Sequence, residues 1–186
     1  MSLPHVVLGL LVEPASGYDL KKSFEATISH FWSAELAQIY PVLSRLEDRG
    51  LLHSTREESE RGPPRKVYRR TEDGVRELQE WIESGPAELR ERLGFLAQVF
   101  FMDTIPLEGR LAFMGRLEAR YRAKVAALEE IEQGWRADDP RYPDDLPDED
   151  FHAHLTLKLG LAKYRVIADW CADAMTAMER RAKRSR

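Results

Sequence analysis

The pattern of apolar and polar positions is clearest in residues 31–52, which predict a single amphipathic helix. Its apolar side chains recur at three- and four-residue spacing and share one face that a core can cover: Ile39, Val42, Leu43 and Leu46. Gly50 predicts the end of this helix, because glycine adopts the left-handed C-terminal turn without a steric penalty. An extended segment is expected to begin directly after it.

Two further helices are predicted before this stretch. Residues 3–12 are almost wholly apolar and predict a buried helix. Ser16 and Asp19 have the spacing of a capping box, in which the serine oxygen accepts a backbone N–H and the acidic side chain accepts the serine's own N–H. A second helix should therefore start near Gly17, and a short connector at residues 30–32 joins it to the third.

A hairpin is predicted after the third helix. Residues 51–57 and 65–70 carry β-branched and aromatic side chains typical of strands, and residues 58–64 between them are rich enough in Gly and Pro to form an unpaired tip. Thr71 then caps another helix. Helices followed by such a hairpin are the outline of a winged helix-turn-helix. Positions 61–70 hold five basic residues and no acidic one, which suits this wing to phosphate contact.

The second half of the chain predicts long helices. A helix that begins at Leu107 keeps a heptad seam as far as Trp135, and residues 138–150, with many acids and three prolines, predict an exposed loop. The last helix has two apolar stripes. We assign one of them to dimer contacts: Leu157, Leu161, Tyr164, Ala168, Cys171 and Met175. The other stripe holds Leu155, Leu159, Val166, Ile167 and Trp170.

Two stripes need two partners, because soluble monomers rarely expose a long apolar face. The helix from Leu107 can cover one stripe, so we predict a twofold homodimer that covers the other. The predicted fold is mainly α with a small β-hairpin wing. A winged helix-turn-helix DNA-binding domain is expected over residues 1–85, and a long-helix dimerisation domain, which is also a candidate effector domain, over residues 86–186.

Composition argues against several classes of protein. No apolar run approaches the roughly 18 to 20 residues of a membrane span, and a signal-peptide pattern is missing, so we expect a cytoplasmic protein without membrane contact. Cys171 is the only cysteine, which excludes a multi-thiolate metal site. His152 and His154 lie two residues apart on a helix and point to different sides, so no metal is expected there. Without a nucleophile, phosphate-loop or paired-carboxylate motif, neither catalysis nor a cofactor is expected.

Net charge argues weakly against a nucleic-acid partner. The chain carries a formal charge of −4, and residues 1–85 hold 11 basic and 14 acidic side chains. Binding to DNA would therefore depend on the locally basic wing and would be sensitive to salt.

Three segments together resemble the winged-helix domain of the PadR family of transcriptional regulators. SGYDL at residues 16–20 opens the second helix, QIYPVLSRLEDRGLL at 38–52 forms the third, and VYRRTEDG at 67–74 closes the wing. The resemblance covers residues 1–83, and the helices of the second half are also similar to that family. It implies a dimeric repressor whose third helix enters the major groove of an inverted-repeat operator in double-stranded DNA. The two wings would lie about one DNA turn apart, roughly 34 Å.

The expected DNA contacts are Gln38, Tyr40, Ser44 and Arg45 on the third helix and Arg61, Arg65 and Lys66 on the wing. Tyr40 matches a tyrosine that faces DNA in regulators of this type, and it lies about 100° from the apolar stripe, although a core position stays open. Gln38 can contact DNA or cap the helix at Glu35. Pro41 requires either a later helix start or a bend.

Regulators of this family often sense small aromatic or phenolic compounds, so a small aromatic effector is a candidate partner. Any single aromatic side chain on an apolar stripe more often belongs to a core than to a ligand site. Two alternative functions stay open. One is a winged helix used for protein contact, which the acidic charge supports, and the other is an aromatic-ligand-binding protein without DNA binding.

Overall fold

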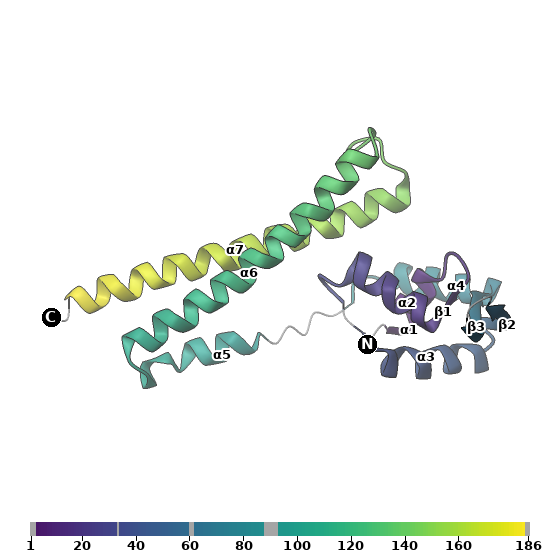
Figure 1. The fold of residues 1–186 in the computed structure, drawn as a ribbon, viewed down its shortest axis with the longest axis horizontal. Helices are drawn as coiled ribbons and strands as arrows, with labels where there is room; N and C mark the ends of the chain where they lie inside the picture. Colours follow the sequence, from purple (N-terminus) through teal and green to yellow (C-terminus); the bar gives the residue numbers. More distant parts are fainter. Residues whose placement is uncertain (1–2, 33, 60–61, 88–92, 185–186) are drawn as a thin grey trace. The chain divides into compact units, whose positions relative to one another are not determined.

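The computed structural model describes residues 3–32, 34–59, 62–87 and 93–184, and it divides into two compact units, Met1–Leu89 and Arg90–Arg186 (Figure 1). The first unit contains α1 (Leu3–Leu10), β1 (Ala15–Ser16), α2 (Gly17–Ser23), a π-helical segment (Phe24–Ile28), α3 (Leu36–Asp48), β2 (Leu52–Ser59), β3 (Gly62–Arg70) and α4 (Glu72–Glu83). The second contains α5 (Gly94–Phe100), a 3-10 turn (Met102–Thr104), α6 (Leu107–Asp138) and α7 (Asp148–Arg184). The mainly α fold with a small β wing is confirmed. Within the described part of the chain, no helix has the length and apolarity needed to cross a membrane.

The capping box before α2 forms as predicted. Asp19 N donates to Ser16 Oγ over 3.2 Å, and Ser16 N donates to Asp19 Oδ2 over 3.1 Å. The Ser16 hydroxyl also donates to Asp19, and this bond is the main reason that the pKa of the Asp19 carboxyl lies below its ordinary value. The start of α2 is therefore held by local chemistry that is legible in the sequence.

The third helix is shorter than the amphipathic pattern predicted. α3 begins at Leu36, not among residues 31–35, so Pro41 lies in its second turn and the helix is continuous through it. Of the two geometries left open for Pro41, the structure has the later start. The helix ends as predicted, since Gly50 adopts a φ of 74°.

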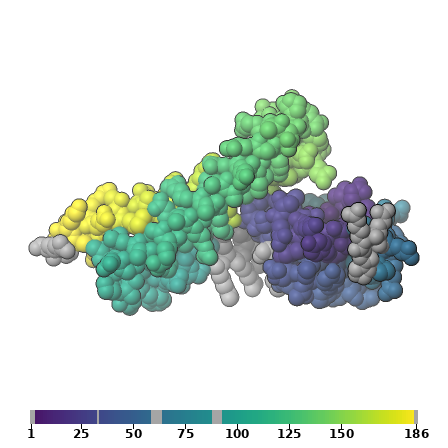
Figure 2. All heavy atoms as spheres, viewed as in Figure 1, coloured from purple at the N-terminus to yellow at the C-terminus, as the bar shows by residue number. Residues whose placement is uncertain are grey.

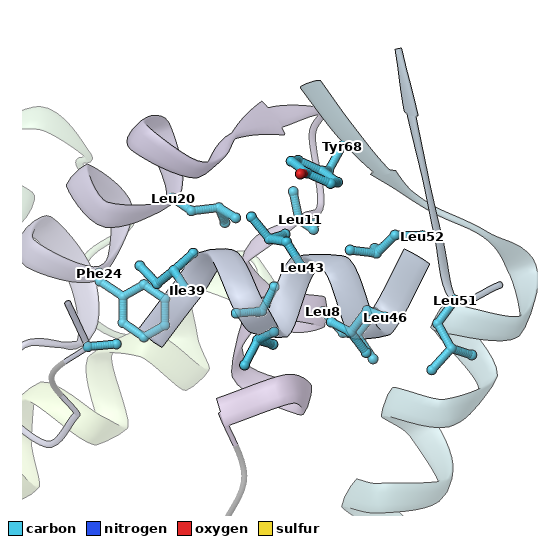
Figure 3. Packing of buried hydrophobic residues seen from close by; sticks show 13 residues of the cluster. Leu8, Leu11, Leu20, Phe24, Ile39, Leu43, Leu46, Leu51, Leu52 and Tyr68 are labelled. Atoms are coloured by element: carbon cyan, nitrogen blue, oxygen red, sulfur yellow. The ribbon is translucent and has the colours of Figure 1, made fainter. Parts of the chain in front are cut away.

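The apolar stripe of α3 is the centre of the first core (Figure 3). All four predicted stripe residues are at most 3% exposed. They pack against buried side chains from α1, α2, the π-helical segment and the two long strands: Val7, Leu8, Leu20, Phe24, Leu52 and Tyr68. Because α3 is buried along this one face, its opposite face is held outward in a fixed orientation.

The sheet has a third strand and a longer hairpin than predicted. Its strand order is β1-β3-β2, and the pairing of β2 with β3 extends to Ser59 and Gly62, with a register shift between Glu57 and Ser59. Residues 60–61 lie outside the described part. The expectation that residues 58–64 are unpaired is wrong at Ser59 and Gly62. β1 pairs with Val67 and Tyr68 of β3, which makes β3 the central strand at these two positions.

The segment that directly follows α3 is in contact with the first turn of α4. Thr71 caps α4 by accepting a bond from Gly74 N over 3.1 Å, and its hydroxyl donates to the carbonyl of Gly50 over 2.9 Å. A Cβ added at Gly74 would collide with the carbonyl oxygen of Leu51. Glycine at this position is therefore what allows the two backbones to approach.

In the second unit, side chains of α6 and α7 pack together in two hydrophobic clusters, and Figure 2 shows the two helices crossing in this view. The six residues assigned to dimer contacts lie in this intrachain interface. Leu157, Leu161, Ala168 and Cys171 are at most 1% exposed, Tyr164 is buried, and Met175 is partly buried. Side chains covered by α6 of their own chain leave little surface for a second protomer, and their assignment to dimer contacts stays a prediction. Burial also raises the pKa of the Cys171 thiol.

A polar cluster closes the α6–α7 end of this unit. The hydroxyl of Tyr142 donates to Glu132 Oε1 over 2.7 Å and lies 2.9 Å from His154 Nδ1. The bond from Tyr142 is the main cause of a lowered pKa at Glu132, whereas burial and the carboxylate raise the pKa of Tyr142 to about 12. His154 thus packs on a tyrosine ring, and no group of three metal-ligand side chains occurs among the residues that the structure describes.

Candidate nucleic-acid interface

The outward face of α3 carries the predicted contact residues. Tyr40 is 48% exposed, and Ser44 and Arg45 are also exposed. Arg45 has no ion-pair partner within the described residues, so its guanidinium is available for a phosphate or for the acceptors of guanine. These three side chains lie on one helix whose other face is locked in the core.

Gln38 caps α3 with one end of its side-chain amide and leaves the other end exposed. Its Oε1 accepts a bond from Glu35 N over 2.9 Å, so Gln38 caps the start of α3. Of the two functions that the spacing allowed, the structure has the cap. The amide –NH2 remains on an exposed side chain and can still donate to a phosphate or a base.

Tyr40 is held against α2 rather than extending freely. A Cβ added at Gly17 would lie 2.6 Å from Cε1 of the Tyr40 ring, so the ring covers the first turn of α2 directly. Both earlier alternatives for Tyr40 are thus partly correct, since one side of the ring packs and about half of the residue stays exposed. A ring that is fixed in this way loses little conformational freedom when it binds a partner.

Lys66 joins the wing to α3. Its Nζ lies 2.6 Å from Glu47 Oε2, and Ser54 Oγ donates to the other oxygen of the same carboxylate. The Lys66–Glu47 bond raises the pKa of Lys66 and lowers that of Glu47. The charge of Lys66 is therefore compensated inside the protein, and its clearest effect is to set the position of the wing relative to α3.

Arg65 is also paired. Its guanidinium lies 3.3 Å from Glu57 on the neighbouring strand and 3.7 Å from Asp19 of the α2 capping box. The side chain is 55% exposed, so solvent weakens both contacts and a phosphate could compete for it. Arg61, the third wing residue predicted to bind DNA, lies outside the described residues.

The hairpin carries three arginines for which no ion pair occurs in the described part of the chain: Arg56, Arg69 and Arg70. Arg56 pairs across the strands with Lys66, and Arg69 with His53. The sequence argument did not select Arg56, and a regular hairpin with Ser59 opposite Gly62 would place position 56 opposite position 65; the register shift between Glu57 and Ser59 brings Arg56 opposite Lys66 instead. Among the described residues of the wing, the arginines without an ion pair therefore differ from Arg65 and Lys66, which were first selected.

Comparison with known proteins places both units in one family. Residues 7–80 match the description "Transcriptional regulator PadR-like family", and residues 91–179 match "Virulence activator alpha C-term". A probable transcriptional regulator of Mycobacterium tuberculosis, Rv1176c, is 29% identical over 190 residues, which cover 96% of this chain and 98% of that protein. The negative transcriptional regulator PadR of Bacillus subtilis is 26% identical over 191 residues, with the same coverage.

Solved structures show the same fold. The crystal structure of B. subtilis PadR in complex with operator DNA has a TM-score of 0.84 at 23% identity and covers 96% of this chain and 99% of that one. The same protein has been solved with p-coumaric acid, with a TM-score of 0.76. The virulence activator AphA of Vibrio cholerae has a TM-score of 0.75 at 28% identity, and the match covers 96% and 98% of the two chains. These relatives are transcriptional regulators and not enzymes, and the chain belongs to the PadR-like family of transcriptional regulators.

Proposed function

We propose that this chain represses transcription by binding an inverted-repeat operator as a homodimer, and that a small aromatic ligand releases it. The observation that carries the proposal is the outer face of α3, where Tyr40, Ser44 and Arg45 are exposed on a helix whose other face is fully buried. A rigid helix with polar side chains on its free face is the element that reads the major groove in helix-turn-helix proteins.

In this proposal, α3 supplies selectivity and the hairpin supplies most of the phosphate contacts. Arg45 donates to guanine or to a phosphate, and the amide –NH2 of Gln38 donates at the other end of the helix. Arg56 and Arg69 contact phosphates because neither has to leave an ion pair with any side chain in the described ranges. Lys66 holds the wing against Glu47 in the complex as it does in the free protein.

The dimer is proposed to form through the exposed part of the second stripe of α7, since Ile167 and Trp170 of that stripe pack against the core of their own chain. Leu159 is 70% exposed, Val166 67% and Leu155 49%, and together they leave a long apolar face uncovered in one chain. A twofold partner would cover this face and would place two copies of α3 on one duplex. In this arrangement the first unit binds DNA and the second one dimerises.

The relatives support the direction of regulation unequally. PadR of B. subtilis is named a negative regulator and has been solved with operator DNA and with p-coumaric acid, which supports repression and an aromatic signal. AphA is named an activator. Transcription in vitro from the chain's own upstream promoter, with and without the protein, tests the sign directly: repression requires that the protein lowers the transcript level.

Gel-shift titration on the upstream DNA at low salt tests the binding proposal. Wild-type protein should shift the fragment, and Arg45→Ala should weaken binding by about 1–3 kcal/mol if Arg45 makes a bidentate base contact. Arg76→Ala is the matched control, because this substitution removes the same charge from an exposed arginine that lies on α4 beside Asp73. Failure of the wild-type protein to shift the fragment would overturn the repressor proposal.

A second function, protein contact through the winged helix, is favoured by one observation. Residues 1–85 hold more acidic than basic side chains, and two of the wing cations are already paired. If the wild-type protein bound no DNA at low salt but remained folded and dimeric, this alternative would be preferred.

A further inference from the structure

A cavity of about 260 Å³ lies between α5 and α6, within the second unit. Figure 1 shows α5 beside the N-terminal part of α6. The lining combines two aromatic rings, an aliphatic side chain, an amide and two guanidinium groups: Phe95, Phe113, Leu117, Gln98, Arg116 and Arg120. None of these residues belongs to the DNA-contact surface proposed above.

The two arginines differ from every other cation on α6. Four cationic side chains of this helix have partners: Arg110 donates to two backbone carbonyls, Arg122 contacts two carboxylates, Lys124 lies over two tyrosine rings, and Arg136 approaches Glu132. Arg116 and Arg120 have no such partner among the residues that the structure describes. The two α6 cations that lack a partner are thus the two that line the cavity.

The sequence around Arg116 and Arg120 explains why they are unpaired. On a helix, the side chains within reach are those three and four residues away. For both arginines these positions hold only alanine, leucine, phenylalanine, lysine or the other arginine, with no acidic residue. Because the two are themselves four residues apart, their like charges lie on one face, and an anion between them would relieve the repulsion.

The rest of the lining suits a flat apolar body. The Phe95 ring has its centroid 6.0 Å from that of Tyr121 and 6.2 Å from that of Trp170, so it is held in an aromatic cluster and presents a preformed wall. Phe113 is partly buried and Leu117 is buried. Gln98 is exposed on α5 and can donate to or accept from a polar group at the far end of a ligand.

We propose that the α5–α6 cavity binds a small aromatic carboxylate. The carboxylate lies between the guanidinium groups of Arg116 and Arg120, which offer the planar donors that match it. The aromatic ring lies against Phe95 and Phe113, and a ring substituent reaches Gln98. The assignment of this ligand as the regulator's signal rests on the proposed function, whereas the proposal that the cavity binds it does not.

Isothermal titration of the full chain tests the site with three probes: 4-hydroxybenzoate, p-coumarate and the methyl ester of p-coumaric acid. We expect at least one carboxylate to bind, and the uncharged ester to bind at least tenfold more weakly. An Arg116→Ala/Arg120→Ala double variant should lose at least tenfold in affinity for the carboxylate, and Arg120→Lys should lose less, because lysine keeps the charge without the planar fork. Arg165→Ala, at an exposed arginine of α7 paired with Glu129, is the charge-matched control and should bind like wild type.

Three results would overturn the proposal: no binding of either carboxylate at millimolar concentration, equal binding of acid and ester, or unchanged binding by the double variant with its helical circular dichroism intact. Inorganic phosphate that competes at the same concentration as the carboxylate would also overturn the aromatic class, since the site would then select charge alone. The operator gel shift separates this site from the proposed function. A carboxylate that binds without changing the shift supports the site and removes only its assignment as the releasing signal.

Discussion

The pairing of Lys66 with Glu47 leads to a quantitative prediction about DNA binding. The slope of log K on log salt reports the number of phosphates that the protein neutralises, at about 0.9 per phosphate on B-DNA. Arg45 has no ion-pair partner among the residues that the structure describes, so in a homodimer Arg45→Ala removes two phosphate contacts and makes the slope shallower by about 1.8 if each copy contacts one phosphate. Lys66 is compensated by a carboxylate at 2.6 Å, so Lys66→Ala should leave the slope unchanged.

The same argument predicts a change of slope in the opposite direction when Glu47 is substituted. Glu47→Gln removes the charge that holds Lys66, so two lysines per dimer become free to bind phosphate, and the slope should become steeper by up to about 1.8. The substitutions should change the free energy of unfolding too little to affect the comparison of slopes. The side chains of Lys66 and Glu47 are 47% and 29% exposed, and a surface pair of this kind contributes about 0–1 kcal/mol.

The assay is fluorescence anisotropy of labelled operator DNA, titrated with each variant at five or more potassium chloride concentrations. Arg76→Ala serves as the charge-matched control and should have the wild-type slope. If Lys66→Ala flattened the slope as much as Arg45→Ala does, Lys66 would have to leave Glu47 on binding, and its assignment to wing position would be refuted.

Gly74→Ala is expected to lower the free energy of unfolding by about 1–3 kcal/mol in urea melts, because overpacking against backbone forces the chain to shift. Gly9→Ala, which adds a Cβ in open space within α1, should instead stabilise by about 0.5–1 kcal/mol, and equal effects would contradict the packing argument. Tyr142→Phe should reduce the pH dependence of stability at both ends. The lowered pKa of Glu132 gives stability that is present above its unfolded pKa near 4.5 and is lost as pH falls below it, and the raised pKa of Tyr142 gives stability that is lost as pH rises from 10 towards 12. If the pH dependence of unfolding were unchanged in Tyr142→Phe, the Tyr142 hydroxyl would not be the group that causes it. Leu159→Glu should halve the mass measured by light scattering without reducing helical circular dichroism, and a retained dimer mass would rule out this stripe as the interface.

Features that depend on neighbouring residues were legible in the sequence. The capping box of Ser16 and Asp19, the stop at Gly50 and the cap at Thr71 all form, because each is decided within a few residues by backbone geometry and one side-chain bond. The buried stripe of α3 also forms, because helical periodicity alone determines which side chains share a face.

Ion pairs between distant segments could not be predicted in this way. Lys66 and Glu47 are 19 residues apart in the sequence. Arg65 forms an ion pair with Asp19, which lies still further away along the chain. A count of basic residues along the wing treats all of them as free, whereas the packed hairpin pairs some with acids from α2, α3 and β2. Charge at a surface is thus a property of what the fold brings within a few ångströms.

The two stripes of α7 separate local from tertiary information most clearly. Periodicity alone predicted that this helix has two apolar faces and, from them, two partners. It could not say which face α6 covers, because both stripes have helical spacing and the choice depends on how the two long helices pack. Packing placed Leu157 and Leu161 inside the chain and left Leu155 and Leu159 exposed. The prediction of a partner came from the order of residues, and the surface proposed for that partner came from the packing of α6 on α7.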